Sequence, residues 1–280
     1  MATTTTKKTA APASKKAAAP ATKKVTAASK KAAPVAKKAA APAAKKAVVA
    51  TPLKPIKDSF TKASLSLHLA ERAGVKLFLP SDVAGHCCGV PFSSKGFEDG
   101  HRTAVNRIVE SFFRWSGSGH LPIVIDTSPC TYGLKTCRAQ LTQENQQKFD
   151  KLLILDSVEY VHSAILPRLP INRQFQSVAL HPVCSAAKMG ISSKLVTLAQ
   201  ACSEEVVVPQ EAGCCAFAGD RGFLHPELTR SATAPEAEEL EPQRFDGYFS
   251  SSRTCEIGMA RATGKPYRSY LQMLEEASRP

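Results

Sequence analysis

The sequence contains no long apolar run. No stretch approaches the ~18 residues that a membrane-spanning helix needs, and the N-terminus lacks the apolar segment of a secretory signal peptide. No glycine-rich turn follows a predicted strand, so no dinucleotide-binding loop of that kind is expected. We therefore expect a cytoplasmic chain without a membrane span.

Acidic residues, aromatic residues and glycine are all missing from residues 1–57. This segment carries 14 lysines, mostly in pairs, and its prolines interrupt any long helix. Because it cannot bury a core, it is predicted to be a disordered basic tail. Its lysines would neutralise phosphates, which favours salt-sensitive, sequence-independent binding of nucleic acid. The alternative is a solubilising extension that binds no partner.

The rest of the chain is nearly neutral. The whole sequence has 37 lysines and arginines against 24 acidic residues, so without the 14 lysines of the tail the balance is 23 against 24. The basic charge therefore says nothing about the folded part. We predict a short helix and junction over residues 58–74, followed by a cysteine-rich α/β domain over 75–280. Its two halves span about 75–170 and 171–280, and the first half is predicted to be truncated.

Cysteine is absent before position 87, yet the chain contains nine. In a reducing compartment, nine thiols favour metal binding or catalysis over disulfides. Four of them form a complete ligand set for an iron–sulfur cluster or for tetrahedral zinc. These four are Cys184, the adjacent pair Cys214 and Cys215, and Cys255.

The order of predicted elements occurs twice along the chain. Apolar segments at 75–80, 121–126, 152–155, 178–181, 206–209 and 247–250 are predicted strands, with helices predicted at 64–73, 98–116, 157–168, 186–201 and 226–240. Strand–loop–helix–strand units of this kind predict an α/β fold with a mainly parallel sheet. The cysteines follow predicted strands, at the edge where such sheets collect their ligands.

A weaker half-site repeats the pattern upstream. Cys87 and Cys88 correspond to Cys214 and Cys215, and Cys130 corresponds to Cys255. The spacing is 42 positions from Cys88 to Cys130 and 40 from Cys215 to Cys255. No cysteine answers Cys184, so this site has three ligands. The two remaining thiols lie in predicted helices and are expected to be buried rather than ligating. They are Cys137 and Cys202.

The two Cys-Cys loops share a basic residue before Gly-Phe. Lys95 and Arg221 occupy this position, where a cation would stabilise an anionic cluster or an anionic partner. The alternative is a solvated lysine and a structural arginine that pairs with Asp220. His86 and His181 adjoin cysteines, and we expect them to orient or pack against the site rather than to ligate. No catalytic residue is predicted.

From about residue 69 onward the chain resembles the cysteine-rich CCG region of several redox proteins. Proteins of this type include a subunit of heterodisulfide reductase, glycolate oxidase iron–sulfur subunits and the C-terminal part of FAD-linked, iron–sulfur D-lactate (D-2-hydroxyacid) dehydrogenases. The motifs that carry the resemblance are CCGVPFSSKGF at 87–97, SPCTYG at 128–133, GDRGF at 219–223 and SSRTCEIGM at 251–259.

The resemblance implies [4Fe–4S] clusters that relay electrons from a reduced flavin to an acceptor. It places all seven cysteines of the two half-sites on ligand positions. Three departures stand out: Ala216 replaces a glycine, the first cysteine of the family is missing, and the FAD-binding and ferredoxin-like domains are absent. FAD would therefore come only from a partner that carries the flavin domain, and the isolated chain should not oxidise substrate.

The first 70 residues resemble a different family. Their lysine- and alanine-rich composition, together with LKPIKDSFTK at 53–62, is similar to the start of HU-type histone-like proteins. The two resemblances meet near residues 69–74, which indicates a fusion. Three functions therefore remain open: an electron-transfer fragment, a nucleic-acid-binding protein with a passenger domain, and a structural Cys₄ zinc module.

Overall fold

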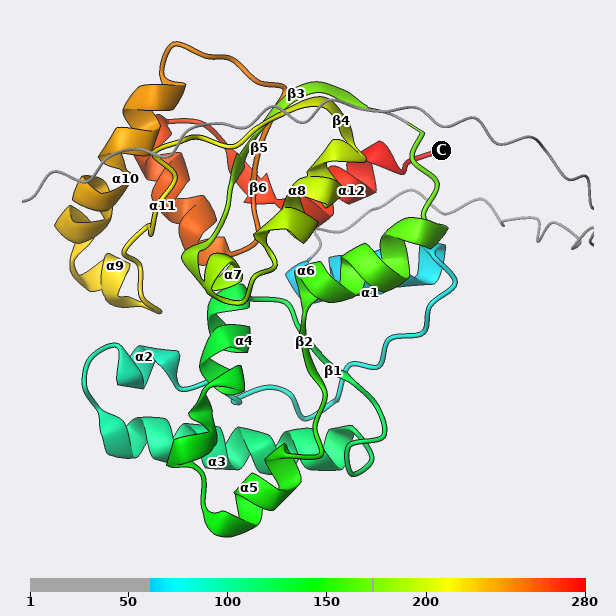
Figure 1. Ribbon diagram of the computed structural model, residues 1–280, viewed down its shortest axis with the longest axis vertical. Helices are drawn as coiled ribbons and strands as arrows, with labels where there is room; N and C mark the ends of the chain where they lie inside the picture. The colour runs from blue at the N-terminus through cyan, green and yellow to red at the C-terminus, as the bar shows by residue number, and fades with distance from the viewer. Residues whose placement is uncertain (1–60, 173) are drawn as a thin grey trace, which may run out of the picture. The chain divides into compact units, whose positions relative to one another are not determined.

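The computed structural model describes residues 61–172 and 174–280. Within them, parallel strands alternate with helices, which confirms the predicted α/β fold (Figure 1). The predicted tail over 1–57 and the HU-like motif up to residue 60 lie outside the described residues.

The strands form two separate parallel sheets. The smaller sheet pairs β1 (Ile123–Ile125) with β2 (Ile154–Asp156). The larger has the order β4-β3-β5-β6. Its strands are β3 (Phe175–His181), β4 (Ser203–Val207), β5 (Gly247–Ser250) and β6 (Tyr267–Ser269).

Helices connect these strands. In the first half they are α1 (Lys62–Arg72), α2 (Val90–Ser93), α3 (Glu98–Trp115), α4 (Ser128–Lys135), the 3₁₀ turn η1 (Cys137–Gln140), α5 (Gln143–Phe149), α6 (Ser157–Tyr160), the π-helical η2 (Val161–Ile165) and the 3₁₀ turn η3 (Leu166–Arg168). In the second half they are α7 (Cys184–Lys188), α8 (Ser192–Gln200), α9 (Arg221–Leu224), α10 (Pro226–Leu240), α11 (Arg253–Thr263) and α12 (Tyr270–Ala277).

Helices cover both faces of the larger sheet. Since side chains alternate along a strand, successive residues of β3 contact different layers. Val178 and Leu180 of β3 face α8, α12 and α1, whereas Ala179 between them belongs to a second cluster with residues of α10 and α11. Figure 1 shows α10 and α11 on one side of β3, β5 and β6, and α8 and α12 on the other. The run from Val178 to His181 is buried on both faces, as is typical of strands in parallel sheets.

The first half has a core of its own. Val105 and Val109 of α3 are fully buried against Leu134 and the apolar side chains of β1 and β2. α1 instead packs on the larger core, where Leu65 and Leu69 contribute to the cluster that contains α12. The smaller sheet therefore depends on α3 and α4, not on α1.

The predicted strand over 75–80 is wrong. These residues form no regular element, and Phe78 and Leu79 are 73% and 48% exposed. Their counterpart in the repeat is β4, which pairs only with β3 among the described strands. In the first half the described residues before position 75 form α1, so no counterpart of β3 is present there. A strand without a neighbour leaves its backbone groups unpaired, which explains why none forms.

Two long predicted helices are divided. The predicted helix over 186–201 is two helices, α7 and α8, separated at Gly190, which has a φ of +71°. That over 157–168 continues from α6 into a π-helical segment and then a 3₁₀ turn at Pro167. A positive φ ends a right-handed helix, and proline cannot donate a backbone hydrogen bond, so each break has a local cause.

Candidate metal centre

Four cysteines gather at the carboxyl edge of the larger sheet. β3 ends at His181 and Cys184 begins α7, while β5 ends at Ser250 and Cys255 lies in the first turn of α11. The Cys214–Cys215 pair follows β4 in the loop that leads to α9. Three parallel strands thus deliver four thiols to one edge, the position at which open α/β sheets bind their ligands.

The thiols contact one another in two pairs. The Sγ atoms of Cys184 and Cys214 are 3.6 Å apart, and those of Cys215 and Cys255 are 2.9 Å apart. Cys214 is exposed and Cys184 half-buried, whereas Cys215 and Cys255 are buried. The adjacent cysteines 214 and 215 therefore face different partners, one near solvent and one in the interior.

Within each pair, the hydrogen bond gives the two thiols different pKa values. The pKa of Cys214 is lowered to about 5, chiefly by the hydrogen bond from Cys184, with smaller contributions from the Ala216 amide and the charges of Lys188 and His181. The same bond raises the pKa of Cys184. In the inner pair the hydrogen bond lowers the pKa of Cys215 and raises that of Cys255. Because metals bind thiolates, one thiol of each pair is already favourable for ligation.

Left-handed backbone shapes both Cys-Cys loops. The amide N–H of Gly89 donates to the Cys87 Sγ at 3.4 Å, and that of Ala216 donates to the Cys214 Sγ at the same distance. Gly89 has a φ of +81° and Ala216 a φ of +55°. The conformation costs a non-glycine residue roughly 1–2 kcal/mol. Ala216, which stands at the position of Gly89, therefore keeps the loop geometry but leaves its backbone strained.

The structure brings the three cysteines of the first half-site together. The Sγ atoms of Cys88 and Cys130 are 2.9 Å apart, and their hydrogen bond lowers the pKa of Cys88 to about 7 and raises that of Cys130. Cys87 lies beside Cys88, and burial raises its pKa. Three thiols at the end of β1 repeat the arrangement at the end of β5.

A half-buried lysine lies close to the first half-site. Lys62, in the first turn of α1, donates from Nζ to the Ser251 carbonyl oxygen at 2.8 Å. Burial lowers its pKa, while the charges of Asp126, Glu256 and other nearby groups, among them Cys130, act in the opposite direction. The ammonium group therefore contacts the segment before Cys255 and is also within electrostatic reach of Cys130. No sequence pattern indicated this placement.

The two predicted basic residues have different surroundings. Lys95 donates from Nζ to Asp220 Oδ2 at 2.8 Å, so that Asp220 pairs with the lysine of the other loop. Arg221 lines a surface pocket with Ser94, Leu224 and others. The expected alternative of a solvated Lys95 and an Arg221–Asp220 pair is not what the structure shows.

The two predicted histidines, His86 and His181, also have different hydrogen-bond partners. His86 bonds to Ser111 Oγ at 2.8 Å from Nε2 and packs edge-on against Trp115. His181 is buried, and its Nδ1 lies 2.8 Å from Glu236 Oε2. Glu236 was missed by sequence reasoning. Its one signal was a place on the buried stripe of α10, which also includes Thr229 and Thr233.

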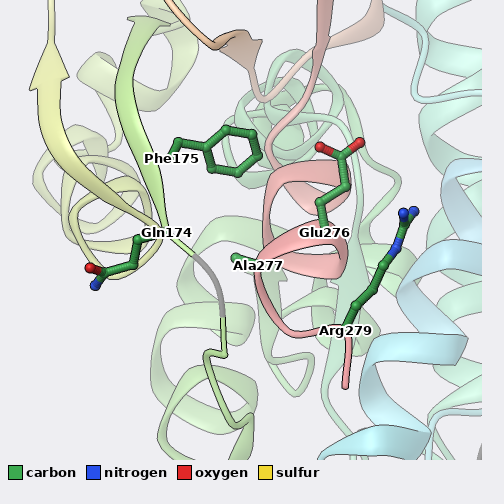
Figure 2. Close-up of a pocket in the computed structure, with 5 residues that line it drawn as sticks. All are labelled: Gln174, Phe175, Glu276, Ala277 and Arg279. Carbon is green, nitrogen blue, oxygen red and sulfur yellow. The ribbon is translucent and has the colours of Figure 1, made fainter.

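The remaining thiols and the second surface hollow lie away from the centre. Cys137 and Cys202 are buried in the two cores. The hollow lies at the opposite, amino-terminal end of β3, where the Phe175 ring points toward α12 and the Gln174 side chain points away from it (Figure 2). It contains no cysteine.

The donor set, four thiols, suits an iron–sulfur cluster or a single tetrahedral ion. Four thiols supply the ligands that a [4Fe–4S] cluster takes. Among residues 61–172 and 174–280, no three His, Cys, Asp or Glu side chains are arranged to hold one metal ion. A tetrahedral zinc ion would need its four sulfurs around one point at about 2.3 Å.

Comparison with known proteins agrees with this donor set. Residues 178–260 match the Cysteine-rich domain family, CCG. The chain is 24% identical over 194 residues to a subunit of the anaerobic glycerol-3-phosphate dehydrogenase of Escherichia coli K12, covering 68% of this chain and 49% of that protein. It is 24% identical over 217 residues to the glycolate oxidase iron-sulfur subunit of the same strain, covering 74% and 52%.

The chain thus spans about half the length of the curated relatives it matches. These matches identify homology to dehydrogenase and oxidase subunits, and they extend neither to D-lactate specificity nor to the HU-like tail. Of the helices that the structure describes, none has the length and apolar character to cross a bilayer.

Proposed function

We propose that this chain is the iron–sulfur electron-transfer portion of a flavin-dependent dehydrogenase that oxidises a 2-hydroxyacid of the D-lactate class. The observation that carries the proposal is the convergence of four thiols from three parallel strands at one sheet edge. The similarity to a glycolate oxidase iron-sulfur subunit supports the redox role. The substrate class rests on the motif resemblance at 87–97 and 251–259.

Cys184, Cys214, Cys215 and Cys255 would hold a [4Fe–4S] cluster, which when bound accepts and passes on single electrons. The chain's own groups prepare the ligands. Cys184 and Cys255 give up their protons on ligation, whereas the Ala216 amide already donates to the Cys214 sulfur. The burial of Cys215 and Cys255 keeps water from the inner side of the site.

The first half-site would hold a cluster less well. Cys87, Cys88 and Cys130 supply three thiols, and Lys62 adds a positive charge nearby. We propose one complete cluster per chain, at the second half-site.

The partner would be a flavin-bearing subunit. Phe97 is 60% exposed and Phe223 53% exposed, and each follows the basic residue of a Cys-Cys loop. Large aromatic side chains are enriched where protein partners meet. Because Lys95 and Asp220 tie the two loops together, these aromatic rings flank the cysteine edge from which an electron would enter or leave.

The test is metal analysis of the full chain purified without oxygen. We expect about four irons and four sulfides per chain, and no zinc. Cys184→Ser should lose most of the iron, while Cys202→Ser, a buried thiol outside the site, should keep it. One equivalent of zinc without sulfide would refute the electron-transfer function and support the zinc module.

A second function has one observation in its favour. The 14 lysines of residues 1–57, unaccompanied by any acidic residue, have the composition of a segment that binds nucleic acid through phosphates. That function would belong to the tail and would not involve the cysteines.

A further inference from the structure

A buried histidine–glutamate pair lies behind the four cysteines. His181 Nδ1 is 3.0 and 2.8 Å from the two carboxylate oxygens of Glu236, and both side chains are about 1% exposed. The other ring nitrogen, Nε2, is buried and has no hydrogen-bond partner among the described residues. A buried polar atom without a partner is costly, so this nitrogen calls for a partner that the chain itself does not supply.

The imidazole is near enough to the thiols for its charge to act on them. His181 is the last residue of β3, three positions before Cys184. Its charge acts on both Cys214 and Cys215, lowering the pKa of each thiol alongside the larger effect of their cysteine partners. Because Glu236 occupies Nδ1, the edge of the ring that remains for the cysteine site is the one with Nε2.

Each ring nitrogen of a histidine can carry a hydrogen and donate it. The Glu236 carboxylate faces Nδ1, so Nε2 is the nitrogen left to donate to another group. The sulfur atoms of an iron–sulfur centre are acceptors for such a donor.

We propose that His181, oriented by Glu236, donates its Nε2–H to a sulfur atom of the iron–sulfur centre held by the four cysteines, and so sets how readily that centre is reduced. This inference rests on the proposed function. His181 is a positioning and tuning residue in it, not a ligand. A carboxylate that fixes a ring close to a metal site is a recurrent arrangement around metal centres.

The expected effect follows from charge. Reduction adds an electron to the centre, so a hydrogen bond to its sulfur stabilises the reduced form more than the oxidised form. Removal of the donor should shift the equilibrium toward the oxidised form by about tenfold, which is ~59 mV for one electron.

The test compares variants of the full chain, purified without oxygen, by iron and sulfide content and by a redox titration followed by electron paramagnetic resonance. His181→Leu removes the donor, whereas His181→Gln places an amide N–H near the position of Nε2. His120→Leu changes an exposed histidine beyond the C-terminal end of α3 and is the control. We expect the Leu variant to lower the midpoint potential with iron unchanged, and the Gln and control variants to stay near wild type.

Two outcomes would overturn the inference. An unchanged potential in a fully loaded His181→Leu variant would show that no such bond exists, and loss of iron from His181→Gln would make the histidine a ligand. If His181→Leu does not fold, Glu236→Gln provides the same comparison, with the exposed Glu238→Gln as its control. Glu236→Gln replaces the carboxylate that orients the ring, so an unchanged potential there would also refute the inference. Absence of iron and sulfide from the wild-type chain would instead refute the proposed function.

Discussion

Lys95 Nζ lies 2.8 Å from Asp220 Oδ2 and joins the first Cys-Cys loop to the second across 125 positions of sequence. The carboxylate is close to half exposed, so water and salt screen the pair. The contact therefore has more influence on the alignment of the two loops than on stability.

Lys95→Ala should lower the free energy of unfolding by less than about 1 kcal/mol, as is usual for exposed ion pairs. Chemical denaturation measures this change. The double variant Lys95→Asp with Asp220→Lys should recover the loss, because it restores opposite charges. A loss of several kcal/mol in the single variant would mean that the pair holds the two halves together.

Ala216→Gly should stabilise the chain. Ala216 has a φ of +55°, a conformation that glycine adopts without strain. We expect a gain of about 1 kcal/mol in the free energy of unfolding, measured by denaturation under reducing conditions. Ala212→Gly, in the same loop but without a positive φ, is the control and should bring no gain.

Cys214 should be the most reactive thiol of the metal-free chain. Its pKa of about 5 means that the thiolate predominates above that pH and disappears as the pH falls through it. At a pH of about 6.5, alkylation followed by peptide mass spectrometry should modify Cys214 before Cys184, whose pKa is raised. Cys184→Ala removes the hydrogen bond and should slow alkylation of Cys214 at that pH. An unchanged rate would show that another group lowers the pKa.

Nucleic-acid binding, if present, should reside in the tail. Phosphate neutralisation predicts affinity that is independent of sequence and falls steeply between about 50 and 200 mM salt. Deletion of residues 1–57 should abolish it, as measured by fluorescence anisotropy with a labelled duplex. Binding that persisted after deletion would place the site on the folded part, whose charge is nearly balanced.

The isolated chain should not oxidise D-lactate, even with added FAD and an artificial electron acceptor. Oxidation of a hydroxyacid requires a flavin held against the substrate and a base for its hydroxyl proton. The described residues offer thiols at the sheet edge and no cradle for a flavin. Measurable D-lactate oxidation by the purified chain, assayed by acceptor reduction, would contradict this expectation.

The sequence predicted the elements that local pattern determines. The helix predicted at 226–240 is α10 with the same bounds, and the strand predicted at 247–250 is β5. Caps and apolar periodicity encode such elements within a few residues of themselves. The placement of cysteines after strands was enough to bring all four to one edge, because parallel strands share a carboxyl end.

Features that depend on distant partners could not be predicted. Nothing local indicates that Cys184 contacts Cys214 while Cys215 contacts Cys255. Glu236 lies 55 positions from His181, and the two meet only because α10 packs beside β3. The contact of Lys62 with the Ser251 carbonyl likewise depends on how α1 packs against the larger core.

The unpaired segment 75–80 shows that a strand forms only where an adjacent strand can pair its backbone groups, whatever the sequence pattern. Its apolar residues have a strand pattern, yet it is a coil with Phe78 exposed. β1 pairs only with β2 among the described strands, so its other backbone edge is available for pairing. One added strand between that edge and 75–80 would supply both missing ladders at once. The same six residues would then change their secondary structure without any change in sequence.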